Sequence, residues 1–353
     1  MRLHSSVFVE TGVLDGPLQN EKFAQNSVNE ITNSYKNSNQ ICYFARVDED
    51  GDPYDRTGCK TCKFLFIFST TEKIWRLKNF IKRRKNMLKT EMRNEASRHI
   101  DEMDTISMLN LMNEENMNAC RAVQAATAEI AKVCDITAQR MVKGGRLFYI
   151  GAGTSGRLGV MDAAECPPTF GVSRDQVIGI IAGGEKCMVQ AAEAEEDNAL
   201  CGENDLKKHG LCEKDVVIGI SASGGAAYVV GALTYANSVG AFSVSISSNK
   251  DTPIEKVAQI AIVADTGAEV ITGSTRMKSG TAQKLILNMI STSVMIKTGK
   301  VYENMMINLK PSNKKLKERM IRIVCEIKNC DAVTAEALLE ANDWKIRNAV
   351  QKQ

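Results

Sequence analysis

Apolar residues recur mostly at helical spacing from Thr105 onward, through Val123 to Met141. This period predicts one long helix, or a broken pair of helices, over residues 105–143. Gly144 follows the last turn, and glycine is the usual residue just past the end of a helix.

Short apolar runs rich in β-branched residues then alternate with helical stretches. We expect strands at residues 146–150, 177–181, 216–220, 241–245 and 260–263. Helices are expected between them, at 156–164, 188–206, 226–239 and 253–257, and a further buried helix at 281–297. This alternation predicts an α/β fold, with a doubly wound parallel five-stranded sheet covered by helices on both faces.

The tail of the chain, residues 314–350, has the pattern of several shorter helices. Its apolar stripe consists of Ala335, Leu338, Leu339, Trp344, Ile346 and Val350. We interpret this stripe as the core of a small C-terminal helical module and not as a cofactor site.

The first 86 residues have no sustained helical or strand period and contain turn signals such as Asp50-Gly51-Asp52-Pro53. They end in the basic run 82–85, which fits a solvated linker better than a nucleic-acid or nuclear-import segment. We expect a poorly ordered N-terminal extension, or a true start at Met87. The predicted domains are therefore an extension over 1–86, a catalytic domain over 87–300 and the helical module over 301–353.

Composition narrows the class of protein. With 44% hydrophobic and 25% charged residues the chain is typical of a globular protein, and its net charge of +3 is too small to indicate nucleic-acid binding. The apolar stretch 64–68 is far shorter than the roughly 20 residues of a spanning helix, and the N-terminus does not resemble a signal peptide. We therefore expect no membrane partner and a cytoplasmic location.

The 11 cysteines are odd in number and scattered, which is typical of reduced thiols. Cys59 and Cys62 form a lone CxxC without a second pair or a histidine at ligand spacing, so we predict no metal site.

Three segments of small polar residues follow predicted strands, where ligands bind in doubly wound sheets. The first is a glycine turn, and its candidate phosphate-binding residues are Gly153, Thr154, Ser155 and Gly156. Glycines let the backbone approach a ligand, and the next helix offers its N-terminus to a phosphate. A dinucleotide site is the rival interpretation, but the acidic residue expected after a second strand is replaced by Glu165-Cys166-Pro167-Pro168.

The other two segments repeat this chemistry. Candidates in the second are Ser221, Ser223 and Gly224, and in the third Ser274, Thr275, Arg276 and Lys278. The cations suit a phosphate or carboxylate. A plain tight turn and ordinary surface basic residues are the alternatives.

Two glutamates, Glu165 and Glu196, each follow a glycine-containing turn. Paired carboxylates beside a phosphate cradle suggest acid/base chemistry on a small phosphorylated molecule. Alternatively, Glu196 belongs to a solvated helix face, since it lies in the acidic run 193–197.

Together these segments resemble a sugar isomerase (SIS) domain, and more narrowly the N-acetylmuramic acid 6-phosphate etherase family. The motifs that carry the resemblance are Thr90–Asn94, Gly151–Arg157, Glu165–Gly171, Ile181–Glu185, Ser221–Gly224 and Thr272–Lys284. They cover roughly two thirds of the chain, from Thr90 to about Val324, and the Glu-Cys-Pro-Pro block is the most specific of them. Residues 1–86 have no counterpart in the family.

The resemblance implies a cofactor-free lyase that splits the D-lactyl ether of the phosphorylated sugar, giving N-acetylglucosamine 6-phosphate and D-lactate. The family's two functional glutamates fall on Glu165, as proton donor, and Glu196, and we assign Glu196 as the base. Gly225-Ala226-Ala227 stands where the family often has Arg-Thr-Pro, so this chain lacks the basic residue that the resemblance would imply near the second turn. The resemblance also implies a homodimer, with a site that the neighbouring subunit could complete.

Two other functions fit the same fold. An isomerase would usually need a histidine for ring opening, and none of the 3 histidines lies in a glycine-turn segment. A non-catalytic sugar-phosphate-binding regulator resembling glucokinase regulatory protein would carry two such domains, whereas one set of motifs is present.

Overall fold

The structure is a computed structural model that describes residues 41–47, 63–69, 87–190, 193–311 and 313–350. The chain divides into two units, Met1–Met87 and Leu88–Gln353. In the first unit, β1 (Ile41–Val47) pairs antiparallel with β2 (Lys63–Ser69). The hydrophobic pattern did not predict this pair, because neither strand shows a clear alternation. The Cys59/Cys62 pair, the turn at 50–53 and the basic run 82–85 lie outside the described residues.

The second unit contains a five-stranded parallel sheet in the order β4-β3-β5-β6-β7. Its strands are β3 (Leu147–Gly151), β4 (Val177–Ile181), β5 (Val216–Ile220), β6 (Phe242–Ser247) and β7 (Ile260–Val263). The predicted fold class is confirmed, and three strands have the predicted boundaries. Gly151 lies level with Ile181 and Ile220 in the neighbouring strands, so the turns that follow β3, β4 and β5 meet at one edge.

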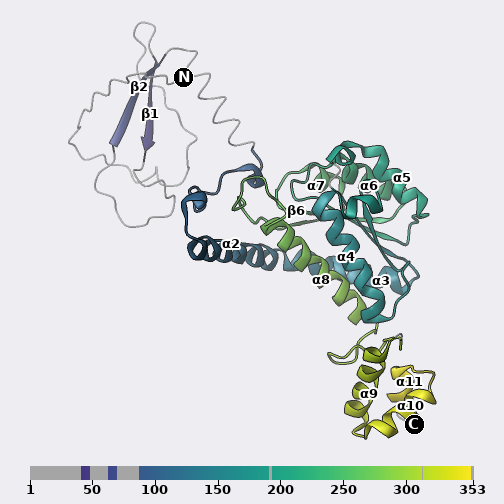
Figure 1. The fold of residues 1–353 in the computed structure, drawn as a ribbon. Helices are drawn as coiled ribbons and strands as arrows, with labels where there is room; N and C mark the ends of the chain where they lie inside the picture. The colour runs from purple at the N-terminus through teal and green to yellow at the C-terminus, as the bar shows by residue number, and fades with distance from the viewer. Residues whose placement is uncertain (1–40, 48–62, 70–86, 191–192, 312, 351–353) are drawn as a thin grey trace, which may run out of the picture. The chain divides into compact units, whose positions relative to one another are not determined.

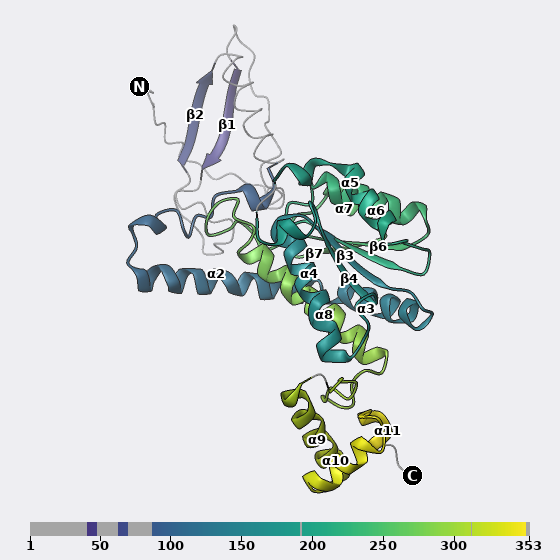
Figure 2. The same cartoon turned by 45° about the vertical axis from the view of Figure 1, so that its right-hand side comes forward.

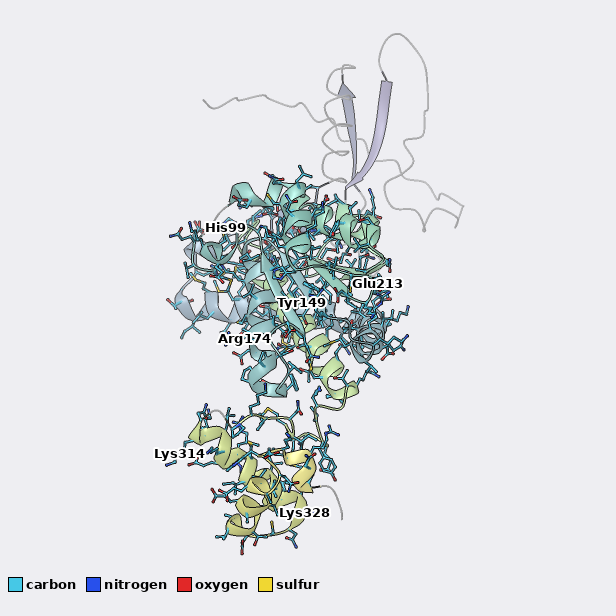
Figure 3. All side chains as sticks on the ribbon, turned by 90° about the vertical axis from the view of Figure 1, so that its right-hand side faces the viewer. His99, Tyr149, Arg174, Glu213, Lys314 and Lys328 are labelled. Carbon is cyan, nitrogen blue, oxygen red and sulfur yellow. The ribbon has the colours of Figure 1, made fainter. Side chains whose placement is uncertain are left out.

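Helices cover both faces of the sheet (Figures 1 and 2). One face packs against α3 (Thr127–Val142), α4 (Gly153–Phe170) and α8 (Lys278–Lys297), and the other against α5 (Ala199–Lys208), α6 (Ala227–Ser238) and α7 (Pro253–Val257). Because side chains alternate along a strand, Leu147 and Tyr149 enter the first core and Phe148 and Ile150 the second. Figure 3 shows Tyr149 in the interior, and it is fully buried.

For two predicted helical stretches, the structure shows where each helix begins and ends. The stretch 105–143 is a broken pair, α2 (Thr105–Ala125) and α3, with the break at Ala126. Helix α4 extends beyond the predicted end at residue 164, and its last turn contains Pro167 and Pro168. It ends at Gly171, whose φ of 64° is the left-handed conformation that glycine adopts freely.

The predicted helix over 188–206 is correct from Ala199 onward and wrong before it. The structure has two short 3₁₀ segments there, η3 (Glu185–Met188) and η4 (Glu193–Asp197), before α5 begins. The physical reason is Asn198, whose side chain accepts hydrogen bonds from Leu200 N at 3.1 Å and Cys201 N at 3.4 Å. An N-cap of this kind starts a new helix and interrupts the one expected from periodicity.

Two short 3₁₀ helices, η1 (Lys89–Glu91) and η2 (Ile100–Glu102), precede α2. The tail forms α9 (Lys314–Lys328), α10 (Ala332–Glu340) and α11 (Ile346–Val350) around an apolar cluster of its own. The predicted apolar stripe is confirmed as part of that cluster. The boundaries proposed for the catalytic domain and the module stay predictions. Among the described residues, no helix has the length and apolar character needed to cross a bilayer.

Asp215 anchors the amino ends of β3 and β5, opposite the edge where the turns meet. Its buried carboxylate accepts hydrogen bonds from Arg146 N at 2.8 Å, Arg146 Nη2 at 2.7 Å and Cys212 N at 3.0 Å. Burial alone would raise the pKa of Asp215, but the hydrogen bonds from Arg146 and Cys212 outweigh it and the pKa is lowered. A depressed pKa stabilises the fold above the unfolded value of about 3.9, and this stabilisation is lost as the pH falls through the folded value.

We expect Asp215→Asn to lower the free energy of unfolding at pH 7 by about 2–3 kcal/mol, since charge-assisted hydrogen bonds are lost. The difference from the wild type should shrink as the pH falls below about 4, because the carboxylate is protonated first in the unfolded chain and then, at its lower pKa, in the folded protein. Urea unfolding at pH 7 and at acid pH measures both effects. An equal destabilisation at the two pH values would contradict this role for the Asp215 charge.

Candidate functional site

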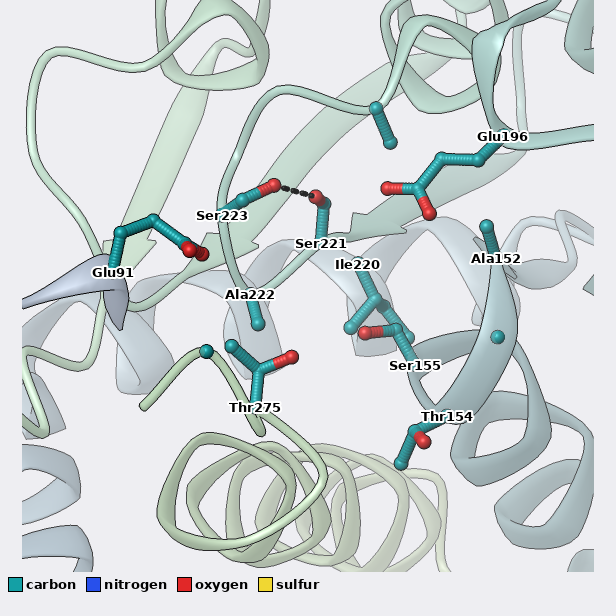
Figure 4. A pocket seen from close by; sticks show the side chains of 13 residues that line it. Glu91, Ala152, Thr154, Ser155, Glu196, Ile220, Ser221, Ala222, Ser223 and Thr275 are labelled. Atoms are coloured by element: carbon teal, nitrogen blue, oxygen red, sulfur yellow. Dashed lines mark hydrogen bonds between the residues drawn. The ribbon is translucent and has the colours of Figure 1, made fainter. Parts of the chain in front are cut away.

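A pocket of about 330 Å³ opens at the edge where the turns meet (Figure 4). It is lined by residues 152–155, Glu196, residues 220–223, Ala226, Gly273, Thr275 and Glu91. All three small-residue segments predicted from the sequence therefore contribute to one cavity. Chain segments far apart in the sequence meet here because parallel strands end at the same edge.

The first turn connects β3 to α4. Gly156 must be glycine, because a Cβ there would lie 2.5 Å from Gly151 O and 2.7 Å from a side-chain carbon of Ile181. Ser155 is buried and donates a hydrogen bond to Gln283 Oε1 at 3.0 Å, so α8 fixes the orientation of this serine. Gly153, Thr154 and Ser155 line the pocket, and Gly156 supports the turn from behind.

The second turn connects β5 to α6. Ser221 Oγ accepts a hydrogen bond from Gly224 N at 3.1 Å and lies 3.4 Å from Ser223 Oγ. Gly224 has a φ of 77°, and a Cβ there would lie 2.4 Å from Thr252 Cβ. Both serines line the pocket, whereas Gly224 shapes the turn that presents them.

Two helix N-termini meet at this cavity without a capping side chain. The N-cap residues are Ala152 for α4 and Ala226 for α6, both pocket-lining, and neither provides a side-chain hydrogen bond to its helix. The first N–H groups of a helix have no intrahelical acceptor, and they carry the positive end of the helix dipole. An anion in the pocket would satisfy them. Ala226 has no side-chain oxygen, so the α6 terminus is left uncapped.

The third segment is only partly in the pocket. Thr275 and Gly273 line it, but Ser274, Arg276 and Lys278 do not. Lys278 is buried, and its ammonium forms an ion pair with Glu115 of α2.

The start of α8 is held by Glu269. Its fully buried carboxylate accepts hydrogen bonds from Lys278 N and from both N and Oγ of Ser279, each at 2.9 Å. A carboxylate at a helix N-terminus is favoured by the helix dipole. Through these contacts Lys278 supports the structure around the site and does not line the pocket.

The two predicted catalytic glutamates are not brought together within one chain. Glu196 is half-buried and lines the pocket, and Figure 4 shows its carboxylate directed toward the side of Ser221. Glu165 is exposed on α4 and is not a lining residue. At 1.5 Å per residue, the helix from Gly153 to Glu165 spans roughly 18 Å.

Cys166, next to Glu165, is a structural residue. Burial, together with Asp162 and Glu165 nearby, raises the pKa of this thiol to about 12. The thiol therefore stays protonated near neutral pH and is a poor nucleophile.

Sequence reasoning missed Glu91, which lines the pocket from η1. The motif Thr90–Asn94 belongs to the family resemblance and could have drawn attention to Glu91. The spacing of this motif alone indicated no role for the glutamate. Within the described ranges, no group of three or more metal-ligating side chains is present. His99 and His209, the two described histidines, do not line the pocket.

Comparison with known families agrees with this architecture. Residues 202–293 match the SIS domain, and residues 129–237 match the glucokinase regulatory protein N-terminal SIS domain. The doubly wound sheet with its pocket at the carboxyl edge is thus that of an SIS-domain protein.

Individual relatives narrow the family. An N-acetylmuramic acid 6-phosphate etherase from Halalkalibacterium halodurans is 52% identical over 263 residues, which are 74% of this chain and 88% of the relative. Another from Aeromonas hydrophila is 51% identical over 261 residues, 74% of this chain and 88% of the relative. The chain therefore belongs to the N-acetylmuramic acid 6-phosphate etherase family. A phosphoheptose isomerase structure from Francisella tularensis matches with a TM-score of 0.43 at 13% identity, covering 55% of this chain and 100% of the other.

Proposed function

We propose that this protein cleaves the D-lactyl ether of N-acetylmuramic acid 6-phosphate, giving N-acetylglucosamine 6-phosphate and D-lactate. The observation that carries the proposal is the half-buried Glu196 facing a pocket of serines and uncapped helix ends, in a chain 52% identical to an etherase. The pocket position of Glu196 in the short 3₁₀ segment η4 supports this role over the alternative in which Glu196 belongs to a solvated helix face.

The phosphate of the substrate fits the end of the pocket formed by the first two turns. Thr154, Ser221 and Ser223 offer hydroxyl groups there, and the N-termini of α4 and α6 offer backbone N–H groups. Backbone N–H groups at helix ends bind phosphate without needing a cation. This arrangement supports binding even though Lys278 is engaged with Glu115.

The reaction needs one base, one acid and water. With the sugar ring open, the C1 aldehyde acidifies the proton on C2, and Glu196 removes it. A second carboxylic acid protonates the ether oxygen on C3 as the C3–O bond breaks and D-lactate departs. Water then adds at C3 of the unsaturated aldehyde. Each proton transfer by a positioned group is worth roughly 10²–10⁴-fold in rate. We expect no redox cofactor, since no step changes an oxidation state.

We assign the acid role to Glu165 of the partner subunit in a homodimer. Within its own chain this glutamate lies roughly 18 Å of helix away from the α4 N-terminus. Exposed apolar side chains on the same helix and on α8 leave surface for a subunit contact: Met161 of α4 and Met289 and Ile296 of α8 are 42%, 44% and 51% exposed. A two-fold dimer formed through α4 would bring each Glu165 to the other subunit's surface.

We propose a cytoplasmic location for this enzyme. The eight cysteines of the described residues are all free, although three of them are buried and five are at least partly exposed. Reduced thiols persist in a reducing compartment.

The function is tested by incubating the purified protein with N-acetylmuramic acid 6-phosphate and measuring D-lactate by a coupled enzyme assay. We expect D-lactate and N-acetylglucosamine 6-phosphate to appear in equal amounts. Binding of either sugar phosphate without D-lactate would overturn the etherase assignment and favour the regulator. Conversion of a sugar phosphate between aldose and ketose forms would favour the isomerase.

A further inference from the structure

A second carboxylate, that of Glu91, lies in the same pocket as Glu196 and comes from a distant part of the chain. Figure 4 shows Glu91 and Glu196 on opposite sides of the cavity, with Ser221 and Ser223 between them. No role for Glu91 follows from the acid/base pair already proposed.

The segment that carries Glu91 is fixed by a buried side chain. Asn249, 4% exposed, accepts a hydrogen bond from Lys89 N at 2.8 Å and donates one to Thr90 Oγ1 at 3.2 Å. The same amide donates to Ala222 O at 3.1 Å, in the turn that presents Ser221 and Ser223. Asn249 therefore ties the backbone before Glu91 directly to the phosphate-binding turn.

The third turn holds this segment from the other side. Gly273 N donates to Thr90 O at 3.2 Å, and Thr90 itself is fully buried. Gly273 has a φ of 76°, which favours glycine, and a Cβ added there would lie in ordinary van der Waals contact with Glu91 Oε2, at 3.4 Å, so this turn borders the carboxylate. In η1, Lys89 forms an ion pair with Asp265, and Figure 4 shows the Glu91 carboxylate directed toward the cavity. The backbone is thus built to hold this carboxylate at the pocket wall.

We propose that Glu91 is a substrate-binding residue that accepts a hydrogen bond from a neutral O–H or N–H group of the amino sugar. This inference rests on the proposed function. An ionised carboxylate is an acceptor only, and an amino sugar offers hydroxyl and amide donors along its chain. The same charge repels the phosphate, so Glu91 orients the substrate with its phosphate toward the α4 and α6 N-termini. Glu91 transfers no proton in this scheme.

The test is Glu91→Gln, which keeps the size of the side chain and removes its charge. We expect KM for N-acetylmuramic acid 6-phosphate to rise about tenfold, because hydrogen bonds to charged groups are stronger than neutral ones, while kcat stays within about twofold. The Kd of N-acetylglucosamine 6-phosphate, measured by calorimetry, should weaken by a similar factor. The affinity for inorganic phosphate should stay the same or tighten, since a repulsive charge is removed. Glu95→Gln is the matched control, because Glu95 is exposed nearby, pairs with Arg98 and does not line the pocket.

Three outcomes would overturn the inference: unchanged KM and Kd, a loss of kcat by about 100-fold or more with KM unchanged, or an equal effect of the Glu95 control. The second outcome would make Glu91 a proton-transfer group. Because Kd for N-acetylglucosamine 6-phosphate is measured without turnover, the result for Glu91 can be interpreted even if the wild type releases no D-lactate. Failure of the proposed function and failure of this inference are therefore separate results.

Discussion

Replacement of Glu196 by glutamine is expected to lower kcat for D-lactate release by about 10²–10⁴-fold, the usual value of a positioned base. An amide has the shape of the carboxylate but cannot take the C2 proton at neutral pH. The Kd of N-acetylglucosamine 6-phosphate should change little, because the phosphate is held by the first two turns. Steady-state kinetics of D-lactate release and calorimetry with the product measure the two quantities.

Asp197→Asn is the matched control for this variant. Asp197 is the next residue in η4, is exposed and does not line the pocket. The kcat of the Asp197→Asn variant should therefore stay within about threefold of the wild-type value. A Glu196→Gln protein that keeps wild-type kcat would remove Glu196 from the mechanism. A loss of product binding as large as the loss of kcat would point to misfolding of η4 instead.

A dimer that combines one Glu165→Gln subunit with one Glu196→Gln subunit is expected to recover about half of the wild-type activity. Each homodimer of a single variant should be nearly inactive. In the mixed dimer, one site combines the intact Glu196 of its own chain with Glu165 of the partner subunit, and the other site has lost both. Co-expression with two different affinity tags and sequential purification isolates the mixed dimer, whose D-lactate release is then measured.

The measured activity separates the two arrangements of the site. If Glu165 acts in its own chain, every site of the mixed dimer lacks one glutamate and the activity stays near that of the single variants. A dimer of Asp197→Asn with Glu196→Gln controls for the tagging and exchange, and should also show about half of the wild-type activity. A protein that sediments as a monomer while fully active would contradict the shared site directly.

Much of the fold could be predicted from the sequence, because the β-branched runs of a doubly wound sheet are buried on both faces. The runs 177–181, 216–220 and 260–263 coincide with β4, β5 and β7. Where prediction failed, side-chain hydrogen bonds decided the outcome. Asn198 starts a new helix inside the stretch 188–206, and periodicity carries no information on such a cap.

The turns that line the pocket could be predicted from the sequence, but the side-chain contacts between distant residues could not. Thr154, Ser155, Ser221, Ser223 and Thr275 line one pocket, since their turns follow strands of one sheet, and their predicted role in binding stays a prediction. Lys278 was predicted as a phosphate ligand from its charge and its position before a helix. Its ion pair with Glu115 joins residues 163 positions apart, which no local pattern could indicate. The assignment of the site residues stays a prediction until the variants above are measured.

The sequence by itself determined the sheet, the three small-residue turns and the family, because these depend on local periodicity and on contiguous motifs. Only the tertiary structure decided which carboxylates share the cavity. Glu91 reaches it through contacts of Thr90 with Asn249 and Gly273, whereas Glu165 is carried away along a rigid helix. The physical reason is that a pocket is made by residues close in space, and packing decides which residues come together, however far apart they lie along the chain.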